Sequence, residues 1–507
     1  MVAMNRPAPV DGFLRRHPHS HAVRRRQNRR VVGIAVLVEI MFVAGAAFGA
    51  DLAVGDVRHT DRSPAHLRVE WDDRAGGEQG FRLWRRRLAP EGPRPWHLAG
   101  EVPANVTHFD DGGLQHLTDY EHKVAAFDAG GEGPAMTVAS PARTPRMANH
   151  LEAHVVVPPG EPVPHSPSAL AGADGRLLLA YVRSPVRGWI DASIWLRRSA
   201  DGGRTWGEPQ RAFTGDTRFG FAKPAVVALP DGTLGMSFSR FTLDAQGRLP
   251  AAGNRERFFV KSQDGGLTWS SPVKMWDGSS NNDSLIVADG NRLLQPLQTG
   301  HGPNSDPLAQ IVASDDFGAT WRTLSRAGAP REAWETGESA LAYAGTRRLV
   351  LLCRHEAAFH SLNFSADNGV SWEGPKTLWL GGGDNPPKIA PIPGTPLLVA
   401  IVHSWQDGAK AKDRRQLASV ISADGGRTWD NFRLIGFAPE GDDGFLQHSL
   451  TFGGDIAYIF YGSGSRHDTQ DGKDLRLIRL HRDFFTSRTA WPYGWQGRPA
   501  VAVSSGR

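Results

Sequence analysis

The stretch SADGGRTW (199–206) returns four more times along the chain with small changes. The later copies are SQDGGLTW (262–269), SDDFGATW (314–321), SADNGVSW (365–372) and SADGGRTW (422–429), so all five fit the pattern S-x-D-x-G-x-T/S-W. Successive copies begin 63, 52, 51 and 57 residues apart. A repeat of about 50 residues built from short strands is typical of the blades of a β-propeller.

The chemistry of this motif is that of a self-contained turn. Its Asp and Ser side chains form hydrogen bonds within the turn, Gly permits a positive φ, and Trp folds beneath as a small local core. We therefore expect these turns on the outside of the blades, where their carboxylates stabilise the turn and belong to no active site.

A second repeat consists of a strand, a short turn and another strand. Its six copies are PSALAGADGRLLLAYVR, PAVVALPDGTLGMSFSR, DSLIVADGNRLLQPLQ, ESALAYAGTRRLVLLCR, PKIAPIPGTPLLVAIVH and HSLTFGGDIAYIFY. In a propeller the first strand of each blade lines the central channel, so its start and the end of the second strand lie at the same mouth. The sequence therefore predicts an all-β, six-bladed β-propeller over residues 151–482.

Polar residues at these strand tips form the predicted pocket. The strand starts contribute His165, Lys223, Asn282, Asp283, Glu338, Asn385 and His448, and the strand ends contribute Arg183, Arg240, His301, Arg354, His403 and Tyr461. Burying so many polar and charged groups would be costly unless water or a ligand filled the channel mouth. Arginines bind carboxylates through paired hydrogen bonds, and carboxylates or histidines supply acid–base chemistry. The set indicates a pocket for an acidic sugar, and a solvated rim without a ligand is the alternative.

The propeller region resembles the sialidases. The five turn motifs are the Asp boxes of that family, which other propellers also carry. More specific is TGESALAYAGTRRLVLLCR, in which Glu338 and Arg354 match a glutamate and an arginine of the sialidase fourth blade. In RRQLASVISADGGRTW, Arg414 or Arg415 matches a further arginine of the family. The resemblance implies that Arg354 and Arg414 hold a substrate carboxylate and that Glu338 acts as a base toward the nucleophile.

The sequence departs from the family pattern at three places. Sialidases begin the first blade with R-I-P, whereas this chain has HSP from His165 onward, and Arg183 is the expected substitute for the missing arginine. The acid/base aspartate aligns with a glycine, which leaves Asp191 as a shifted candidate. His448 stands where the family has its nucleophilic tyrosine, and Tyr461 is one strand away.

These features lead to one functional prediction and two alternatives. The prediction is a glycoside hydrolase of the sialidase superfamily, nominally an exo-α-sialidase, that acts on an acidic glycan. Histidine and tyrosine beside arginines also suit β-elimination from a uronic acid, so a polysaccharide lyase is an alternative. The other is a glycan-binding propeller without turnover. Metalloprotease, Walker and dinucleotide motifs are missing from the sequence, so we predict neither a cofactor nor a metal.

Residues 51–145 predict a separate β-sandwich before the propeller. In LRVEW, Leu67, Val69 and Trp71 share one face of an alternating strand, and Tyr120 precedes another strand in DYEHKVAAF. The region resembles a fibronectin type III domain, with Trp71 as its core tryptophan and Tyr120 in its tyrosine corner. The resemblance implies a structural role for both residues.

Residues 1–50 have the layout of an export signal. The cluster RRRQNRR precedes VVGIAVLVEIMFVAGAAFGA (31–50), which is apolar except for Glu39 and ends in small residues. We expect a secreted, periplasmic or membrane-anchored protein, because a retained anchor helix is the alternative to a cleaved signal. Residues 483–507 form a C-terminal tail.

The net charge indicates which partners are expected, and the cysteine content bears on the core. The net charge is +5, from 58 basic and 53 acidic residues, and eight of the basic residues are arginines in the first thirty positions. The remainder is about neutral, which argues against a nucleic-acid partner. The sole cysteine, Cys353, lies in an apolar run and is expected to be a buried hydrophobic residue.

Overall fold

The computed structural model of the chain describes residues 51–486, with gaps at 64–65, 91, 113, 115–117, 145–152, 161–162, 185–190, 217, 243–245, 247–254, 278–283, 298–307, 329–337, 355–359, 379–384, 404–413, 439–443 and 465–471. The predicted leader (1–50) and nearly all of the predicted tail lie outside the described residues. The described residues all belong to one compact unit. Within the described part, no helix is long and apolar enough to cross a membrane.

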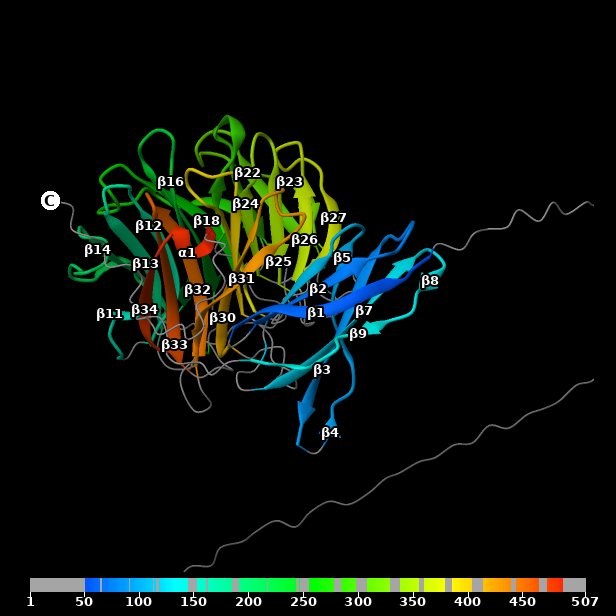
Figure 1. The fold of residues 1–507 in the computed structure, drawn as a ribbon. Helices are drawn as coiled ribbons and strands as arrows, with labels where there is room; N and C mark the ends of the chain where they lie inside the picture. Colours follow the sequence, from blue (N-terminus) through cyan, green and yellow to red (C-terminus); the bar gives the residue numbers. More distant parts are fainter. Residues whose placement is uncertain are drawn as a thin grey trace, which may run out of the picture. The chain divides into compact units, whose positions relative to one another are not determined.

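The first part of this unit is a β-sandwich, as predicted (Figure 1). One sheet has the order β1 (Val54–Ser63), β2 (His66–Asp73), β6 (His108–Gly112). The other is built around β7 (Asp119–Asp128) and β3 (Gly80–Ala89), joined by β4 (Gly92–Pro93), β5 (His97–Pro103), β8 (Gly131–Glu132), β9 (Met136–Thr137) and β10 (Ala142–Arg143). Trp71 and Tyr120 are both buried, which confirms that they are core residues. Kinship to fibronectin modules remains a resemblance.

Six four-stranded antiparallel sheets follow and form the blades of a propeller (Figure 1). Blades 1 to 3 are β12 (Val163–Ala171), β13 (Leu177–Ser184), β14 (Ser193–Ser199), β15 (Gln210–Phe213); β16 (Phe219–Ala228), β17 (Leu234–Thr242), β18 (Arg255–Ser262), β19 (Val273–Asp277); and β20 (Ile286–Val287), β21 (Leu293–Leu297), β22 (Ala309–Ser314), β23 (Arg322–Ala327). The short 3-10 helix η1 (Asp289–Asn291) lies within blade 3.

Blades 4 and 5 repeat the same order. They are β24 (Ser339–Tyr343), β25 (Leu349–Cys353), β26 (His360–Ser365), β27 (Glu373–Leu378), and β28 (Lys388–Pro391), β29 (Leu398–His403), β30 (Gln416–Ser422), β31 (Asp430–Phe437). Apolar side chains of neighbouring blades interlock; Val399 and Ile401 of blade 5, for example, pack in one cluster with Ile459 and Ile478 of blade 6. These interblade cores fix the inner strands that carry the predicted site.

Blade 6 combines strands from both ends of the propeller. Its strands β32 (Gly444–Gly453), β33 (Ile456–Gly464) and β34 (Gly472–His481) are completed by β11 (His154–Val157), which pairs with β34 (Figure 1). This pairing closes the ring and covers a sheet edge that would otherwise be open. The short helix α1 (Asp483–Thr486) follows β34.

The Asp boxes form the turns predicted from their sequence. In the first, the Ser199 hydroxyl accepts the Gly203 amide at 2.8 Å, and Asp201 accepts the Thr205 amide and hydroxyl at 2.9 and 2.6 Å. Trp206 donates its indole N–H to the Gly203 carbonyl at 3.1 Å. These hydrogen bonds hold the pKa of Asp201 below its usual value. The carboxylates therefore stabilise turns.

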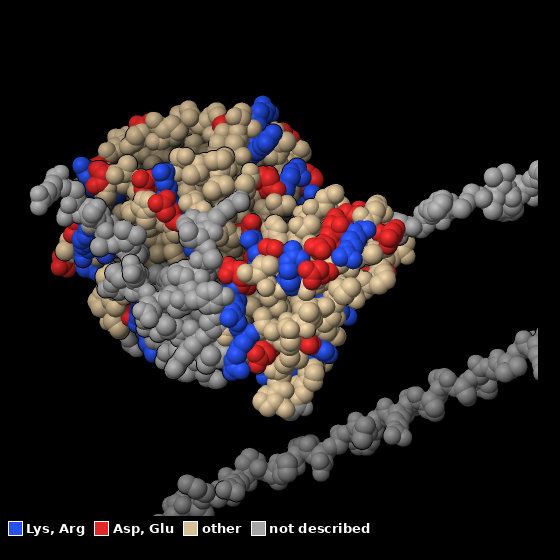
Figure 2. All heavy atoms as spheres, in the orientation of Figure 1, with Lys and Arg blue, Asp and Glu red and all other residues tan. Residues whose placement is uncertain are grey.

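Two further predictions concern burial and surface charge. Cys353 is fully buried, and burial raises the pKa of its thiol to about 11, so it is a core residue and no nucleophile. Basic and acidic side chains are interspersed on the face of the molecule in Figure 2, in keeping with the neutral composition of this part of the chain.

Candidate functional site

The first strands of three blades each carry a β-bulge near the strand start. At a bulge the regular alternation of side chains between the two faces of the strand is interrupted. The bulged residues are Ser166 in blade 1, Lys223 in blade 2 and Gln447 in blade 6, with φ of 52°, 50° and 23°. Strand pairing shifts register at each of them. Positive φ is uncommon outside glycine, and bulges redirect side chains next to functional sites. Because the same irregularity occurs in three blades, we take these three residues as the starting point for the candidate site.

Side chains from three blades meet on the carboxylate of Glu338. Lys223 Nζ lies 2.5 Å from Oε1, and the Gln447 amide nitrogen donates to the same oxygen at 3.5 Å. Arg354 Nη1 donates to Oε2, while the Arg354 amide donates to the Glu338 carbonyl at 3.2 Å. The side chains of Lys223 and Glu338 are only 3% and 8% exposed. The structure thus brings predicted strand tips together.

The charges around Glu338 determine its protonation state. Burial alone would raise its pKa, but Lys223, Arg354 and Arg414 together hold the pKa well below its usual value. Glu338 therefore stays a carboxylate at every physiological pH. Because a carboxylate stabilised in this way is a weak base, its surroundings do not favour the base role that the family resemblance implies.

A chain of hydrogen bonds extends from Glu338 into blade 1. Ser166 donates its hydroxyl to Gln447 Oε1 at 2.6 Å, and His165 Nδ1 lies 2.9 Å from the Ser166 oxygen. His165 Nε2 lies 2.9 Å from the Ser184 hydroxyl. Because Ser166 donates to Gln447, His165 donates from Nδ1 and accepts at Nε2. Burial and the charge of Lys223 lower the His165 pKa to about 3, so the ring is neutral.

Arg414 lies at the same centre and is fixed by Asn385. Its Nε donates to Asn385 Oδ1 at 2.7 Å, and both residues are buried. His360 Nε2 lies 3.3 Å from the Asn385 carbonyl. The positive charge of Arg414 also contributes to lowering the pKa of Glu338. Arg414, rather than Arg415, is therefore the residue of this pair that belongs to the cluster.

Two buried histidines lie beside Arg414. His403 Nε2 donates to the Phe445 carbonyl at 2.6 Å, and His448 Nε2 donates to the Ile401 carbonyl at 3.3 Å. Their rings meet edge to face with centroids 5.2 Å apart. Burial lowers both pKa values, that of His448 to about 3, with Arg414 adding to the effect. Both rings are therefore neutral, and the described hydrogen bonds of their Nε2 atoms go to backbone carbonyls instead of to Glu338.

Tyr461 lies in the core between blades. Its ring packs 4.8 Å from that of Phe445, within the apolar cluster of blades 5 and 6. Burial raises its pKa to about 12 against the opposing effect of Arg476. The structure does not bring Tyr461 to Glu338, whose described partners are Lys223, Arg354 and Gln447.

The described contacts of the other predicted residues are with groups outside the cluster. Arg183 lies over the Trp195 ring at 5.9 Å, and Arg240 pairs with Glu256 at 2.6 Å. Asp191 is exposed in the turn between the 185–190 gap and β14. Arg415 is half-buried, and its carbonyl accepts the Ala438 amide at 2.7 Å. The predicted pocket residues Asn282, Asp283 and His301 lie outside the described residues.

Sequence reasoning missed Ser166, Ser184 and Gln447. It assigned the pocket to the neighbours His165 and His448, because regular alternation points those residues to the channel. A bulge shifts the alternation by one residue. One sequence feature could have identified Ser166: like Lys223, it immediately precedes the proline with which its copy of the strand–turn–strand repeat begins.

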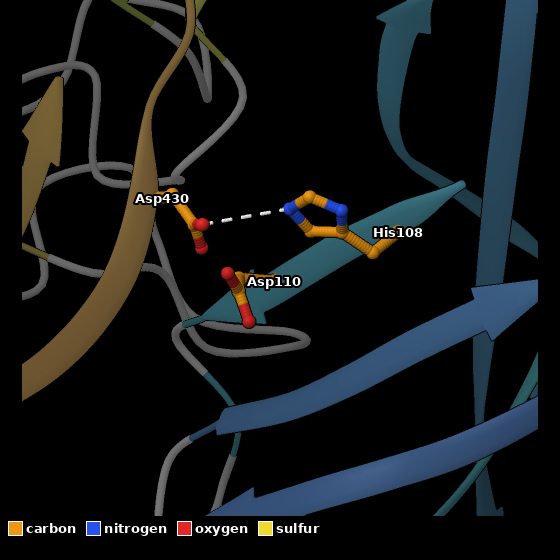
Figure 3. A group of neighbouring side chains, drawn as sticks. All are labelled: His108, Asp110 and Asp430. Atoms are coloured by element: carbon orange, nitrogen blue, oxygen red, sulfur yellow. Dashed lines mark ion pairs between the residues drawn. The ribbon is translucent and has the colours of Figure 1, made fainter. Parts of the chain in front are cut away.

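A group that could hold a metal lies elsewhere in the described structure. One oxygen or nitrogen each of His108, Asp110 and Asp430 lies within 4.8 Å of the others (Figure 3). Arg68 Nη2 already binds both carboxylates, at 2.8 Å from Asp110 and 2.5 Å from Asp430. Its guanidinium supplies the positive charge that a metal would bring.

Comparison with known proteins identifies relatives of the chain. No family model matches it. A sialidase of Micromonospora viridifaciens is 30% identical over 348 residues, which are 60% of this chain and 52% of the relative. The chain thus spans about half the length of that relative.

Solved structures share the fold at low sequence identity. A mutant of the NanB sialidase from Streptococcus pneumoniae is 10% identical with a TM-score of 0.51, covering 85% of this chain and 99% of its own. The leech intramolecular trans-sialidase is 11% identical with a TM-score of 0.52, covering 87% and 98%. A Dyadobacter fermentans protein of unknown function has a TM-score of 0.52 at 16% identity, covering 66% and 99%. The chain is therefore similar in sequence to a sialidase over about half of that protein's length, and it has the propeller fold of these solved structures.

Proposed function

We propose that the protein is an exported glycoside hydrolase of the sialidase superfamily that releases a terminal acidic sugar, nominally as an exo-α-sialidase. The observation that carries this proposal is the convergence of Lys223, Arg354 and Arg414 on one buried centre. Cationic donors from three blades suit a carboxylate, because charge-assisted hydrogen bonds in a partly desolvated site are strong. The relationship to a named sialidase supports the same substrate class.

In the proposed site, Lys223 takes the place of the arginine that the first blade lacks. Arg354 and Arg414 bind the sugar carboxylate with it. Glu338 remains charged and stabilises the positive charge that develops on the ring in the transition state. Its described partners include no side chain that can act as a nucleophile, since Gln447 stands beside it. Water therefore attacks the anomeric carbon directly and loses its proton to solvent, and the departing oxygen takes up a proton from solvent.

The direct test is hydrolysis of a fluorogenic sialoside, with the product identified by mass. We expect free sialic acid and a loss of at least about 100-fold in kcat/KM for Arg354→Ala, because two charge-assisted hydrogen bonds disappear. Arg176→Ala is the matched control, since the Arg176 side chain is 79% exposed and pairs with the neighbouring Asp174. Equal losses in the two variants would refute a role for Arg354 in substrate binding.

A non-catalytic glycan-binding propeller is the second candidate. It is favoured by the position of Tyr461 in the interblade core and of Gln447 beside Glu338. Tight binding of sialosides with no product after long incubation would establish it. Elimination from a uronic acid is less well supported, because the pKa of about 3 makes His165 and His448 weak bases. An unsaturated, ultraviolet-absorbing product would nevertheless reverse this order.

Export through residues 31–50 is part of the proposal. The apolar run behind an arginine cluster supports it. Sequencing the N-terminus of the protein from culture medium, periplasm and membrane fractions distinguishes a cleaved signal from a retained anchor. Full-length protein found only in the cytoplasm would refute export.

A further inference from the structure

The sandwich and blade 5 are in close contact inside the compact unit. At the end of β6, a Cβ atom on Gly112 would lie 2.2 Å from the ring of Phe432 on β31, so only glycine permits this approach. The ring of His66 stacks on that of Phe432, with the centroids 5.6 Å apart and an interplanar angle of 11°. Phe432 is 1% exposed and belongs to the core shared by blades 4 and 5. The sandwich thus reaches a core residue of the propeller.

A network of ion pairs lies next to this contact. Arg68 of β2 bridges Asp110 of β6 and Asp430 of β31, and His108 lies 3.5 Å from Asp430 (Figure 3). The hydrogen bond that His108 donates to Asp430 raises the His108 pKa. The cationic Arg68 and His108 of the sandwich thus face the anionic Asp430 of blade 5, and this charge complementarity orients β6 relative to β31.

The same interface reaches the strand that follows Arg414. Gln416 Nε2 donates to the Leu114 carbonyl at 3.1 Å, and both residues are buried. Gln416 begins β30, two residues after Arg414. On its other side, the Arg414 carbonyl accepts the Phe445 amide of β32 at 2.9 Å. Arg414 is thus held between blade 6 and a strand end that the sandwich contacts.

We infer that the N-terminal sandwich is a brace for the anion site: its contact at Leu114 holds the start of β30, and its contact at Gly112 anchors the sandwich on β31, so that Arg414 points at the substrate carboxylate. Gln416 is the positioning residue that transmits this support. The inference rests on the proposed function for its substrate and goes beyond it, because it makes the sandwich a part of the binding site and more than a spacer.

The test combines two measurements: binding of sialic acid, and hydrogen exchange of the Phe445 amide, which needs no ligand. Gln416→Met keeps the side-chain volume and removes the donor to Leu114, and Gly112→Ala forces the sandwich away from Phe432. Leu83→Ala is the control, because Leu83 is buried in the sandwich core away from this interface and its loss only destabilises the sandwich. All variants are made in the full chain.

We expect both interface variants to weaken binding of sialic acid on the order of tenfold and to leave the affinity for its methyl ester unchanged, because the ester lacks the charge that Arg414 recognises. Neither variant should weaken binding further in an Arg414→Ala background. Exchange of the Phe445 amide, followed by mass spectrometry, should accelerate in both variants and stay at the wild-type rate in Leu83→Ala.

Unchanged affinity together with unchanged Phe445 exchange in the interface variants would overturn the inference. Additive losses in the Arg414→Ala background would also overturn it, since the sandwich would then act by another route. Should the wild type bind neither sugar, the proposed function fails and the Phe445 exchange rate alone decides whether the sandwich braces Arg414.

Discussion

At the scale of single residues, the environment of Glu338 determines what this site can do. A glutamate beside a tyrosine would act as its base, whereas here a lysine, an arginine and an amide surround the carboxylate. The group stays charged and accepts hydrogen bonds, so it balances the neighbouring cations. Its chemistry follows from its neighbours more than from its place in a motif.

This view predicts an unusual result for Glu338→Gln. The substitution removes a negative charge from among Lys223, Arg354 and Arg414, so the variant should bind sialic acid more tightly, by roughly tenfold, while turnover falls sharply. Titration calorimetry measures the affinity. Glu256→Gln is the matched control, because Glu256 pairs with Arg240 away from the cluster. Weaker binding by Glu338→Gln would mean that the carboxylate contacts the ligand directly.

At the scale of strands and turns, the sequence predicts those features that follow from a local residue pattern, namely the turns, the blades and the strand ends. The five Asp boxes predict the blades, and the strand–turn–strand repeat predicts that Glu338, Lys223 and Arg354 lie at strand tips. The resemblance to the sialidases adds Arg414. Gln447 could not be predicted, because a bulge changes the face of a side chain without leaving a mark in hydrophobic periodicity. Closure by β11 was equally hidden, since the pairing of a four-residue strand with β34 is not local.

The Asp-box turns lead to a prediction about stability. In the last box, Asp424 accepts the amides of Arg427 and Thr428, both at 2.9 Å, and the Thr428 hydroxyl at 2.6 Å. Asp424→Ala should lower the melting temperature by roughly 1 °C, the shift expected from about 1 kcal/mol in a unit of this size, and leave ligand affinity intact. Differential scanning calorimetry checks it against Asp174→Ala, whose carboxylate caps a simpler exposed turn. No difference between the two would contradict the structural role of the box.

At the scale of the whole molecule, buried neutral histidines connect stability to pH. Burial lowers the pKa of several of them far below the ordinary value of 6.5, namely His59, His165, His403 and His448. As the pH falls below about 6.5, the unfolded chain takes up protons that these rings cannot bind in the folded state, so stability is lost. His108, with its raised pKa, has the opposite and smaller effect.

The free energy of unfolding should therefore drop between pH 6.5 and 5, a range in which carboxylates hardly titrate. The expected slope is roughly 1.4 kcal/mol per pH unit for each such histidine. Urea unfolding of the wild type at several pH values measures it, and His448→Asn should show a shallower slope by about one histidine. A free energy that stays flat over this range would show that these rings are not buried in the neutral form.

In the proposed site, three cations from separate blades bind the carboxylate of an acidic sugar. Titration calorimetry of the wild-type protein with sialic acid and with its methyl ester measures how much of the binding depends on that carboxylate. We expect the acid to bind at least about 10- to 100-fold more tightly than the ester, because charge-assisted hydrogen bonds are lost with the charge. Equal affinities, or binding of neither, would contradict it.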